Sequence, residues 1–289
     1  MSVEILKDFA TLAGRYDGFI LDLWGVIHDG TKPYPGAVET LARLKDSGKP
    51  TVLLSNAPRR GAALIEQMAS IGIERQLYGG VMSSGEAVHL ELQARTDPFF
   101  AKLGRRLYHL GPDRDRNVFE GLAYEAVLLE QADFILNTGP VSFEDSVADY
   151  EDVLSQGAKR GLPMICANPD ITVIRLGVPI VCAGALAERY KELGGTVTQR
   201  GKPDPAIYPA CLKALNLKPG QKALAVGDGL HTDIAGANAA GIDCVLVAGG
   251  IHRAELGIDW GATPSAQAVS KLLAVHAAMP TAVIPTFRW

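Results

Sequence analysis

The chain has 289 residues, of which 47% are hydrophobic and 21% charged, and its formal net charge is −4 at pH 7. This composition is typical of a globular protein with enough residues for one large domain or two smaller ones. The mildly acidic balance gives no reason to expect nucleic acid or an anionic membrane surface as a partner.

Short apolar runs alternate with helical patterns in the first quarter of the chain. The run GFILD (18–22) predicts a buried strand, and the apolar spacing within AVETLARL (37–44) predicts a helix after it. A second strand is predicted at TVLLS (51–55). The helical pattern that follows it ends at Gly72, a residue type that often terminates helices.

The last third of the chain shows the same alternation. KALAVG (222–227) predicts a strand, and TDIAGANAAG (232–241) predicts a helix of small residues that Thr232 would cap. DCVLVAGG (243–250) predicts a further strand. Strands that alternate with helices indicate βαβ units, and therefore a Rossmann-like parallel sheet with right-handed crossovers.

Polar residues stand at the carboxyl ends of three predicted strands. Asp22 ends the first strand, Ser55 ends the second, and Asp228 follows the strand at 222–227. In open parallel sheets, ligands bind beyond the carboxyl ends of the strands. These three residues therefore give the first indication of a functional site.

The middle of the chain, from about 80 to 180, has shorter strand-like pieces between helical stretches. RRLYHLG (105–111), ADFILNTG (132–139) and PMICANPD (163–170) are the strand-like pieces. The pattern fits a continuation of the first sheet and also an inserted second domain. We find no internal repeat, low-complexity tract or flexible linker here that would decide between them.

Targeting and redox signals point to the cytoplasm. No apolar run approaches the roughly eighteen residues that a spanning helix needs, and the N-terminal segment does not resemble a secretory signal. The cysteines are scattered without C-x-x-C spacing, at Cys166, Cys182, Cys211 and Cys244. We therefore expect buried free thiols rather than disulfides or a zinc site.

Three acids, a hydroxyl and a lysine carry the candidate chemistry: Asp22, Asp228, Asp233, Ser55 and Lys202. Mg²⁺ prefers oxygen ligands, so the acids could hold such an ion, with Asp233 as a ligand or beside one. A carboxylate oxygen of Asp22 could attack phosphorus, and the resulting acyl phosphate would divide one displacement into two easier ones. Ser55 and Lys202 would bind the transferring phosphoryl group.

The order of these residues resembles the four sequence motifs of the haloacid dehalogenase-like hydrolase superfamily. The matching segments are LDLWGV (21–26), LLSNA (53–57), GKPDP (201–205) and GDGLHTD (227–233). The resemblance implies that Asp22 is the nucleophile and that Ser55 and Lys202 bind phosphate. It also implies that Asp228 and Asp233 are metal acids and that the cofactor is Mg²⁺.

The spacing of the motifs resembles one branch of that superfamily. Ser55 follows Asp22 by 33 residues, whereas Lys202 follows Ser55 by 147, which leaves room for a cap after the second motif. VMSSGEA (81–87), CANPD (166–170) and CAGALAERY (182–190) resemble the NagD-type phosphatases of subfamily IIA, with a C2 cap. We therefore expect a core at 1–80 and 183–289 and an inserted α/β cap at 81–182.

Resemblance to this subfamily also implies a substrate class. Its members typically dephosphorylate sugar phosphates, nucleotides or similar small molecules. Asn168 and Asp170 match residues that face the active site in the subfamily, although NPD also favours a turn. Asn56, which follows Ser55, is a third candidate for substrate binding.

The sequence departs from the family pattern at Trp24, where the second acid of the first motif is expected. In the family that acid protonates the leaving oxygen and then activates water. An indole N–H is a donor only and does not titrate. Loss of a positioned general acid or base typically costs on the order of 10²–10⁴-fold in rate. The family also uses the backbone carbonyl at this position as a metal ligand, a role that Trp24 retains.

Three interpretations follow. In the first, which we expect, the protein is a phosphatase in which another group moves the proton, and the nearest candidates are His28, Asp29 and His231. In the second, the leaving group needs no proton, as in the dehalogenases; those enzymes, however, carry the cap between the first two motifs and do not need the metal acids. In the third, the protein binds a phosphorylated ligand with weakened catalysis.

The sequence leaves two further features open. A homo-oligomer is compatible with it, although no pattern determines the oligomeric state. The terminal residues Arg288 and Trp289 fit either a docked tail or an interface anchor.

Overall fold

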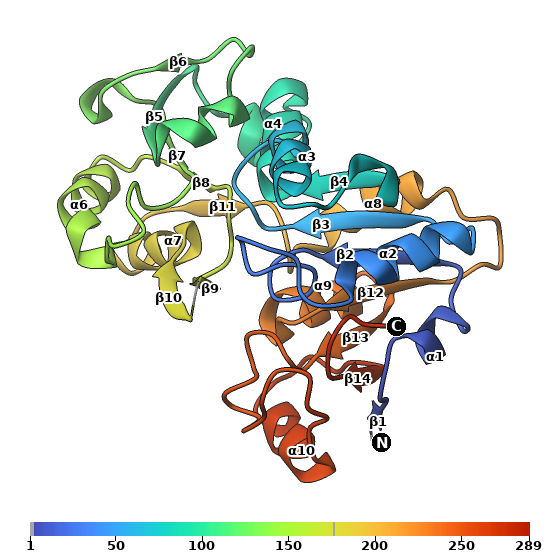
Figure 1. The fold of residues 1–289 in the computed structure, drawn as a ribbon. Coiled ribbons are helices and arrows are strands. Elements are labelled where there is room, and N and C mark those ends of the chain that lie inside the picture. Colours follow the sequence, from blue (N-terminus) through green and yellow to red (C-terminus); the bar gives the residue numbers. More distant parts are fainter. Residues whose placement is uncertain (1–2, 176) are drawn as a thin grey trace. The chain divides into compact units, whose positions relative to one another are not determined.

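The computed structural model describes residues 3–175 and 177–289, which divide into two compact units (Figure 1). The first unit comprises the chain up to Ser55, Leu64–Met82 and Lys202–Trp289. The second comprises Asn56–Ala63 and Ser83–Gly201.

The first unit contains a seven-stranded sheet in the order β1-β14-β13-β12-β2-β3-β4. These strands are β1 (Glu4–Ile5), β2 (Gly18–Asp22), β3 (Thr51–Ser55), β4 (Gly80–Ser83), β12 (Ala223–Gly227), β13 (Asp243–Val247) and β14 (Ala282–Ile284). Every pairing from β1 to β3 is parallel. Because β2 and β3 are buried at every position, they read as continuous apolar runs in the sequence. The predicted Rossmann-like fold is confirmed.

Helices connect the strands of this sheet. They are α1 (Ala10–Ala13), α2 (Ala37–Asp46), α3 (Gly61–Ser70), α8 (Tyr208–Leu215), α9 (Ala235–Ala239) and α10 (Ala266–Ala274), with 3₁₀ turns at Arg75–Leu77 and Pro205–Ile207. The helix α2 buries Ala37, Leu41 and Leu44, which is the apolar face that the sequence predicts. The helix α8 contacts β2 and β3, so it helps to fix the two strands that end on Asp22 and Ser55.

The predicted helix cap at Thr232 is wrong. The chain forms a π-helical turn at Leu230–Ile234 before α9 begins, and Thr232 lies inside that turn. The Thr232 hydroxyl is 3.2 Å from Oδ2 of Asp233 instead of capping the helix. A π-helical turn of this kind is uncommon and often accompanies a functional site.

The second unit contains a separate five-stranded parallel sheet in the order β11-β8-β7-β5-β6. Its elements are α4 (Ser84–Ala94), α5 (Pro98–Ala101), β5 (Arg106–Leu110), β6 (Glu125–Ala126), β7 (Phe134–Asn137), α6 (Glu151–Lys159), β8 (Met164–Cys166), α7 (Ala183–Glu192) and β11 (Val197–Gln199). The strands β9 (Thr172–Arg175) and β10 (Val178–Val181) form a separate antiparallel pair, and 3₁₀ turns occupy Asp113–Val118, Leu129–Gln131 and Val147–Tyr150. The middle of the chain therefore does not continue the first sheet.

Apolar cores cover both faces of the second sheet. Ile135 of β7 packs in one core with residues of α6 and α7, whereas Phe134 and Leu136 pack in the other with residues of α4 and α5. This alternation is the ordinary two-residue period of a strand. The second unit therefore has its own three-layer core.

The expected boundary at 182/183 is wrong. The helix α7 packs in the core of the second unit, and β11 pairs in parallel with β8 of the same sheet. Residues 183–201 therefore belong to the second unit, and the chain returns to the first at Lys202. The segment Asn56–Ala63 also belongs to the second unit, although we expected it in the core.

Three smaller expectations can be compared with the structure. No helix among the described residues is long and apolar enough to cross a membrane. All four cysteines are buried free thiols. The C-terminal residues lie against the first unit, since the Arg288 carbonyl accepts the Phe9 N–H at 2.8 Å and the Trp289 N–H donates to the Thr40 hydroxyl at 2.9 Å. This arrangement fits the docked-tail interpretation.

Candidate active site

The carboxyl ends of β12, β2 and β3 lie side by side in the first sheet. Asp22 is in register with Leu54, and Leu21 is in register with Val226. Ser55 and Asp228 therefore flank Asp22 at the same edge of the sheet. The strand β3, which follows β2 in the chain, pairs with one side of β2, whereas the much later strand β12 pairs with its other side. The strand order therefore reverses at β2, and open parallel sheets bind ligands at such a switch point.

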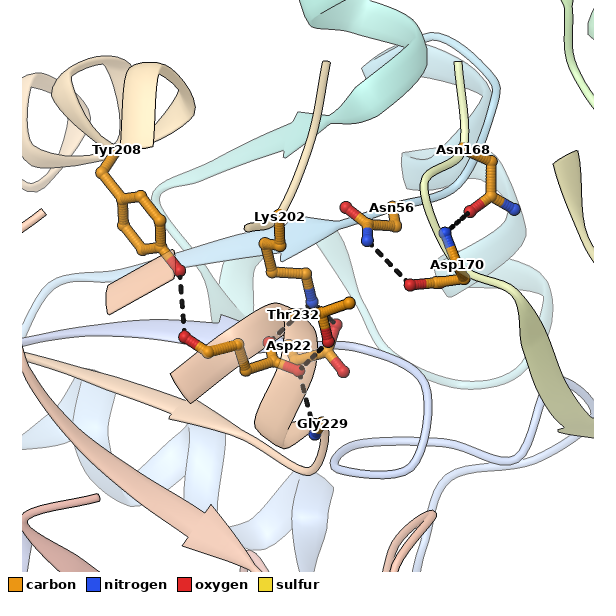
Figure 2. Close-up of polar contacts among 9 residues, drawn as sticks. Asp22, Asn56, Asn168, Asp170, Lys202, Tyr208, Gly229 and Thr232 are labelled. Carbon is orange, nitrogen blue, oxygen red and sulfur yellow. Dashed lines mark hydrogen bonds and ion pairs between the residues drawn. The ribbon is translucent and has the colours of Figure 1, made fainter. Parts of the chain in front are cut away.

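Lys202 joins two of the predicted acids. Its Nζ donates to Oδ1 of Asp22 at 2.6 Å and to Oδ1 of Asp233 at 2.7 Å (Figure 2). The three side chains are almost completely buried, with exposed fractions of 4% for the lysine and 7% for each acid. A buried lysine between two carboxylates is well placed to bind an anionic group in the same site.

Burial raises the pKa of Asp22 well above its ordinary value. The charge of Asp233 raises this pKa further, whereas the nearby Lys202 ammonium lowers it. The charge of Asp228 also raises it. A bound cation would favour the ionised form of Asp22 for the same electrostatic reason that Lys202 does.

Asp228 is fixed by the backbone around it. Its Oδ2 accepts the Ile251 N–H at 2.8 Å. A Cβ atom on Gly25 would lie 1.9 Å from that oxygen, and one on Gly250 would lie 2.2 Å from it. Gly25 also has a φ of +81°, so its lack of a side chain serves both the backbone conformation and the close approach of the acid. The sequence does not reveal the Ile251 contact, because a backbone N–H has no residue-type signature.

Hydrogen bonds fix both the side chain and the backbone of Asp233. Its Oδ2 accepts the Gly229 N–H at 3.1 Å, and the Tyr208 hydroxyl donates to its backbone carbonyl at 3.3 Å (Figure 2). Tyr208 is buried in α8 and was not among the predicted site residues. Its only sequence signal is its position six residues after Lys202.

The three acids fit a divalent cation. Asp22, Asp228 and Asp233 each offer a carboxylate oxygen, these oxygens lie within 4.8 Å of one another, and all three residues are buried. When all three carboxylates are ionised, they carry more negative charge than the one lysine offsets, and a bound cation would balance the excess. A set of oxygen donors is the type that Mg²⁺ prefers.

Trp24 packs within the loop that follows β2. Its half-buried ring lies edge-on to the His28 ring, with 5.5 Å between the ring centroids. A Cβ atom on Gly30 would lie 2.2 Å from Cη2 of the indole, and Gly30 has a φ of +89°. The side chain that replaces the family's acid therefore has a packing role in this loop.

Two of the three candidates for the missing proton donor, His28 and Asp29, have other roles in the structure. His28 is 2% exposed, its Nδ1 accepts the Gly30 N–H at 2.9 Å, and burial lowers its pKa to about 4, so the ring is neutral near pH 7. Burial opposes ionisation of Asp29, but hydrogen bonds from Thr31 and Lys32 hold its pKa below the ordinary value. His231 is exposed, and its ring lies 4.5 Å from that of His276. Neither His28 nor Asp29 has the protonation state of a general acid at neutral pH.

The predicted substrate-binding residues meet in the second unit. Asn56 Nδ2 donates to Oδ1 of Asp170 at 2.8 Å, and the Asp170 N–H donates to Oδ1 of Asn168 at 3.0 Å (Figure 2). The second contact is an Asx turn, so the turn interpretation of NPD is correct. Asn56 and Asn168 are buried and Asp170 is half-buried. Direct contact of these residues with a substrate stays a prediction.

Fold and site together define an α/β protein with a metal-competent group of buried acids and a lysine at the switch point of a parallel sheet. Family models described as "Haloacid dehalogenase-like hydrolase" and "HAD-hyrolase-like" match residues 19–125 and 199–274. The crystal structure of a haloacid dehalogenase-like hydrolase from Brucella suis 1330 is 34% identical, with a TM-score of 0.79, and the match covers 87% of this chain and 92% of that one. The chain belongs to the haloacid dehalogenase-like hydrolase family.

Named relatives narrow the type within this family. The ribonucleotide monophosphatase NagD of Escherichia coli K12 is 28% identical over 240 residues, which are 80% of this chain and 87% of that protein. The D-glycerol 3-phosphate phosphatase of Mycobacterium tuberculosis is 24% identical over 247 residues, which are 84% of this chain but 66% of that longer protein. The chain is therefore a NagD-type member of subfamily IIA, as its motifs predict.

Proposed function

We propose that the protein is a Mg²⁺-dependent phosphatase that hydrolyses a small phosphorylated metabolite, a sugar phosphate or a nucleotide, through an aspartyl-phosphate on Asp22. One observation carries the proposal: Lys202 bridges Asp22 and Asp233 at 2.6 and 2.7 Å, and Asp228 completes a cluster of carboxylate oxygens within 4.8 Å. The named relatives, which include a glycerol phosphate phosphatase and a ribonucleotide monophosphatase, support the same reaction class.

The residues divide the reaction into two displacements. A carboxylate oxygen of Asp22 attacks phosphorus, and the bond to the leaving oxygen breaks. The leaving oxygen takes up a proton from solvent or from a titratable group other than residue 24. Lys202 and Ser55 hold the phosphoryl oxygens and offset their charge. Water then attacks the aspartyl-phosphate, which releases inorganic phosphate and restores Asp22. The bound cation would supply further charge stabilisation, held by Asp22, Asp228, Asp233 and the backbone carbonyl of Trp24.

The second unit acts in this proposal as the cap that selects the substrate. Asn56, Asn168 and Asp170 bind the organic part of the molecule, because they bring several hydrogen-bonding groups to one buried cluster. Asn168 and Asp170 lie in the segment that follows the end of β8 at Cys166, at the carboxyl end of a parallel strand.

Phosphate release from an activated aryl phosphate and from a panel of sugar phosphates and nucleotides, with and without Mg²⁺, tests the proposal. We expect turnover that requires Mg²⁺ and that falls to background in Asp22→Asn. Asp46→Asn is the matched control, since Asp46 is an exposed residue at the end of α2. Undiminished hydrolysis by Asp22→Asn would exclude the proposed nucleophile.

Two alternative functions give different results in the same assay. A protein that only binds a phosphorylated ligand would bind metal and phosphate without turnover of any substrate. A dehalogenase would release halide without metal, a reaction that uses Asp22 as nucleophile but gives Asp228 and Asp233 no role as metal ligands.

A further inference from the structure

The loop after β13 contacts both parts of the chain that carry the metal acids Asp228 and Asp233. The Ile251 N–H donates to Oδ2 of Asp228 at 2.8 Å. The next side chain, His252, accepts the Leu230 N–H on its Nε2 at 3.3 Å. Leu230 opens the π-helical turn that contains Asp233. Two consecutive residues of one loop thus hold Asp228 and the turn of Asp233.

We propose that His252 is a positioning residue for the metal acids, and that Glu255 fixes the ring state that this role requires. This inference rests on the proposed metal site and adds a residue that acts through the backbone rather than as a ligand. It gives a role to the segment GGIHRAE (249–255), which the four family motifs do not include.

The hydrogen bonds fix the tautomer of His252. A backbone N–H can only donate, so Nε2 must be the acceptor in the contact with Leu230. Nδ1 then carries the proton and donates it to Oε2 of Glu255 at 3.1 Å. Burial lowers the pKa of His252, which favours the neutral ring; Glu255 opposes this shift, whereas His276 and His231 reinforce it.

The hydrogen bond from Leu230 to His252 supports the turn that carries Asp233. Leu230 is fully buried, and the turn that it opens is closed by the Ile234 N–H donating to the Gly229 carbonyl at 3.1 Å. Without the imidazole acceptor, the Leu230 N–H would lose its partner at the start of this turn. Buried donors without acceptors are costly, so the turn would rearrange and move the Asp233 carboxylate away from the other acids.

A neighbouring metal site is the competing explanation. His252, Glu255 and His276 offer ligand atoms within 4.8 Å of one another. However, both ring nitrogens of His252 already make hydrogen bonds, one to Leu230 and one to Glu255. A ligand role would need one of these contacts to break, which is why the structure favours positioning.

Electron paramagnetic resonance of free Mn²⁺ tests the proposal directly, because Mn²⁺ can replace Mg²⁺ and its unbound form gives the signal. We expect one Mn²⁺ per chain, and a dissociation constant that rises about 10- to 100-fold in His252→Ala, the range for partners that orient metal ligands. His252→Gln should recover most of the affinity, since its amide oxygen can accept the Leu230 N–H. Arg253 is an exposed residue of the same loop, so Arg253→Ala should bind Mn²⁺ as tightly as the wild type.

Several results would overturn the proposal. Wild-type affinity in a folded His252→Ala would do so, and so would a His252→Gln variant as weak as alanine. Two Mn²⁺ per chain, with one lost in His252→Ala, would show that His252 is a ligand. If His252→Ala does not fold, Glu255→Gln replaces it, because Glu255 is half exposed, and it should weaken Mn²⁺ binding in the same direction. Unchanged binding there would also count against the proposal.

A separate variant distinguishes this inference from the proposed metal site. Asp228→Asn should abolish tight Mn²⁺ binding if the three acids hold the metal. If Asp228→Asn binds Mn²⁺ normally, the metal site itself is wrong. If Asp228→Asn loses binding while His252→Ala keeps it, only the positioning role fails.

Discussion

Replacement of Lys202 by methionine removes the only positive partner that the described hydrogen bonds give to Asp22. The ammonium contacts Asp22 and Asp233 at 2.6 and 2.7 Å, and none of the three side chains is more than 7% exposed. Solvent screening is therefore small. Removal of one partner from a buried ion pair typically costs about 3–5 kcal/mol. We expect Lys202→Met to lose about that much free energy of unfolding at pH 8 without metal.

The loss should depend on pH in a definite direction. The folded pKa of Asp22 is raised above its unfolded value, so the folded state binds the extra proton and stability falls as pH rises through that window. Lys202 lowers this pKa, and its removal raises the pKa further. The deficit of Lys202→Met should therefore shrink as pH falls, by at most about 1.4 kcal/mol per pH unit over which Asp22 becomes protonated.

Urea denaturation at pH 5 and pH 8 in the presence of EDTA measures both effects. Lys213→Met is the matched control, since Lys213 is an exposed residue of α8 and should lose less than about 0.5 kcal/mol. The same loss of stability at pH 5 and pH 8 would contradict the raised pKa of Asp22 on which this prediction rests. A deficit below about 1 kcal/mol at pH 8 would show that the buried lysine is not needed to offset the acids.

Three further predictions concern the acid, the glycine and the metal. Trp24→Asp should hydrolyse alkyl phosphates on the order of 10²-fold faster than Trp24→Asn, measured as kcat/KM, because only the aspartate can protonate a poor leaving group; equal rates would mean that proton transfer does not limit turnover. Gly25→Ala should weaken Mg²⁺ activation, since its Cβ would lie 1.9 Å from Oδ2 of Asp228, whereas Gly48→Ala, with a similar positive φ and open space, should keep the affinity and lose only stability. Removal of Mg²⁺ by EDTA should lower the Tm of the wild type, which gains about 2.7 kcal/mol at one hundred times the Kd, and should leave Asp228→Asn unaffected.

The strand ends of the site are predictable because their signal is local. Buried parallel strands appear as apolar runs, and a carboxylate directly after such a run marks the edge of the sheet. Asp22, Ser55 and Asp228 fall at this edge in the structure, as the sequence predicts. The sequence also identifies Lys202, but not its partners, which lie 180 and 31 residues away in the chain.

Features that depend on distant contacts were not predictable. The helix α7 has an ordinary amphipathic pattern, which does not say whether it packs on the first sheet or the second. Thr232 satisfies the local preference for a helix cap, yet the turn is shaped by Asp233, whose Oδ1 contacts Lys202 and whose Oδ2 contacts Gly229. The contact with Lys202 joins residues 31 apart in the chain, far beyond the range of a capping preference. The role of the Ile251 N–H is equally invisible, because every residue except proline has that group.

The site keeps the family's charged residues but has Trp24 in place of the family's second acid. The acids and the lysine that would stabilise charge on the phosphoryl group are in place, whereas position 24 offers no proton and instead packs on His28 and Gly30. In the proposed mechanism, charge stabilisation favours the attack of Asp22 on any phosphoryl group, but the departure of an alkoxide still needs a proton. The proposed mechanism therefore predicts that the chemistry of the leaving group helps to determine which substrates this protein hydrolyses. A substrate that leaves as a weakly basic anion, or that brings its own proton donor, suits this site better than a simple alkyl phosphate.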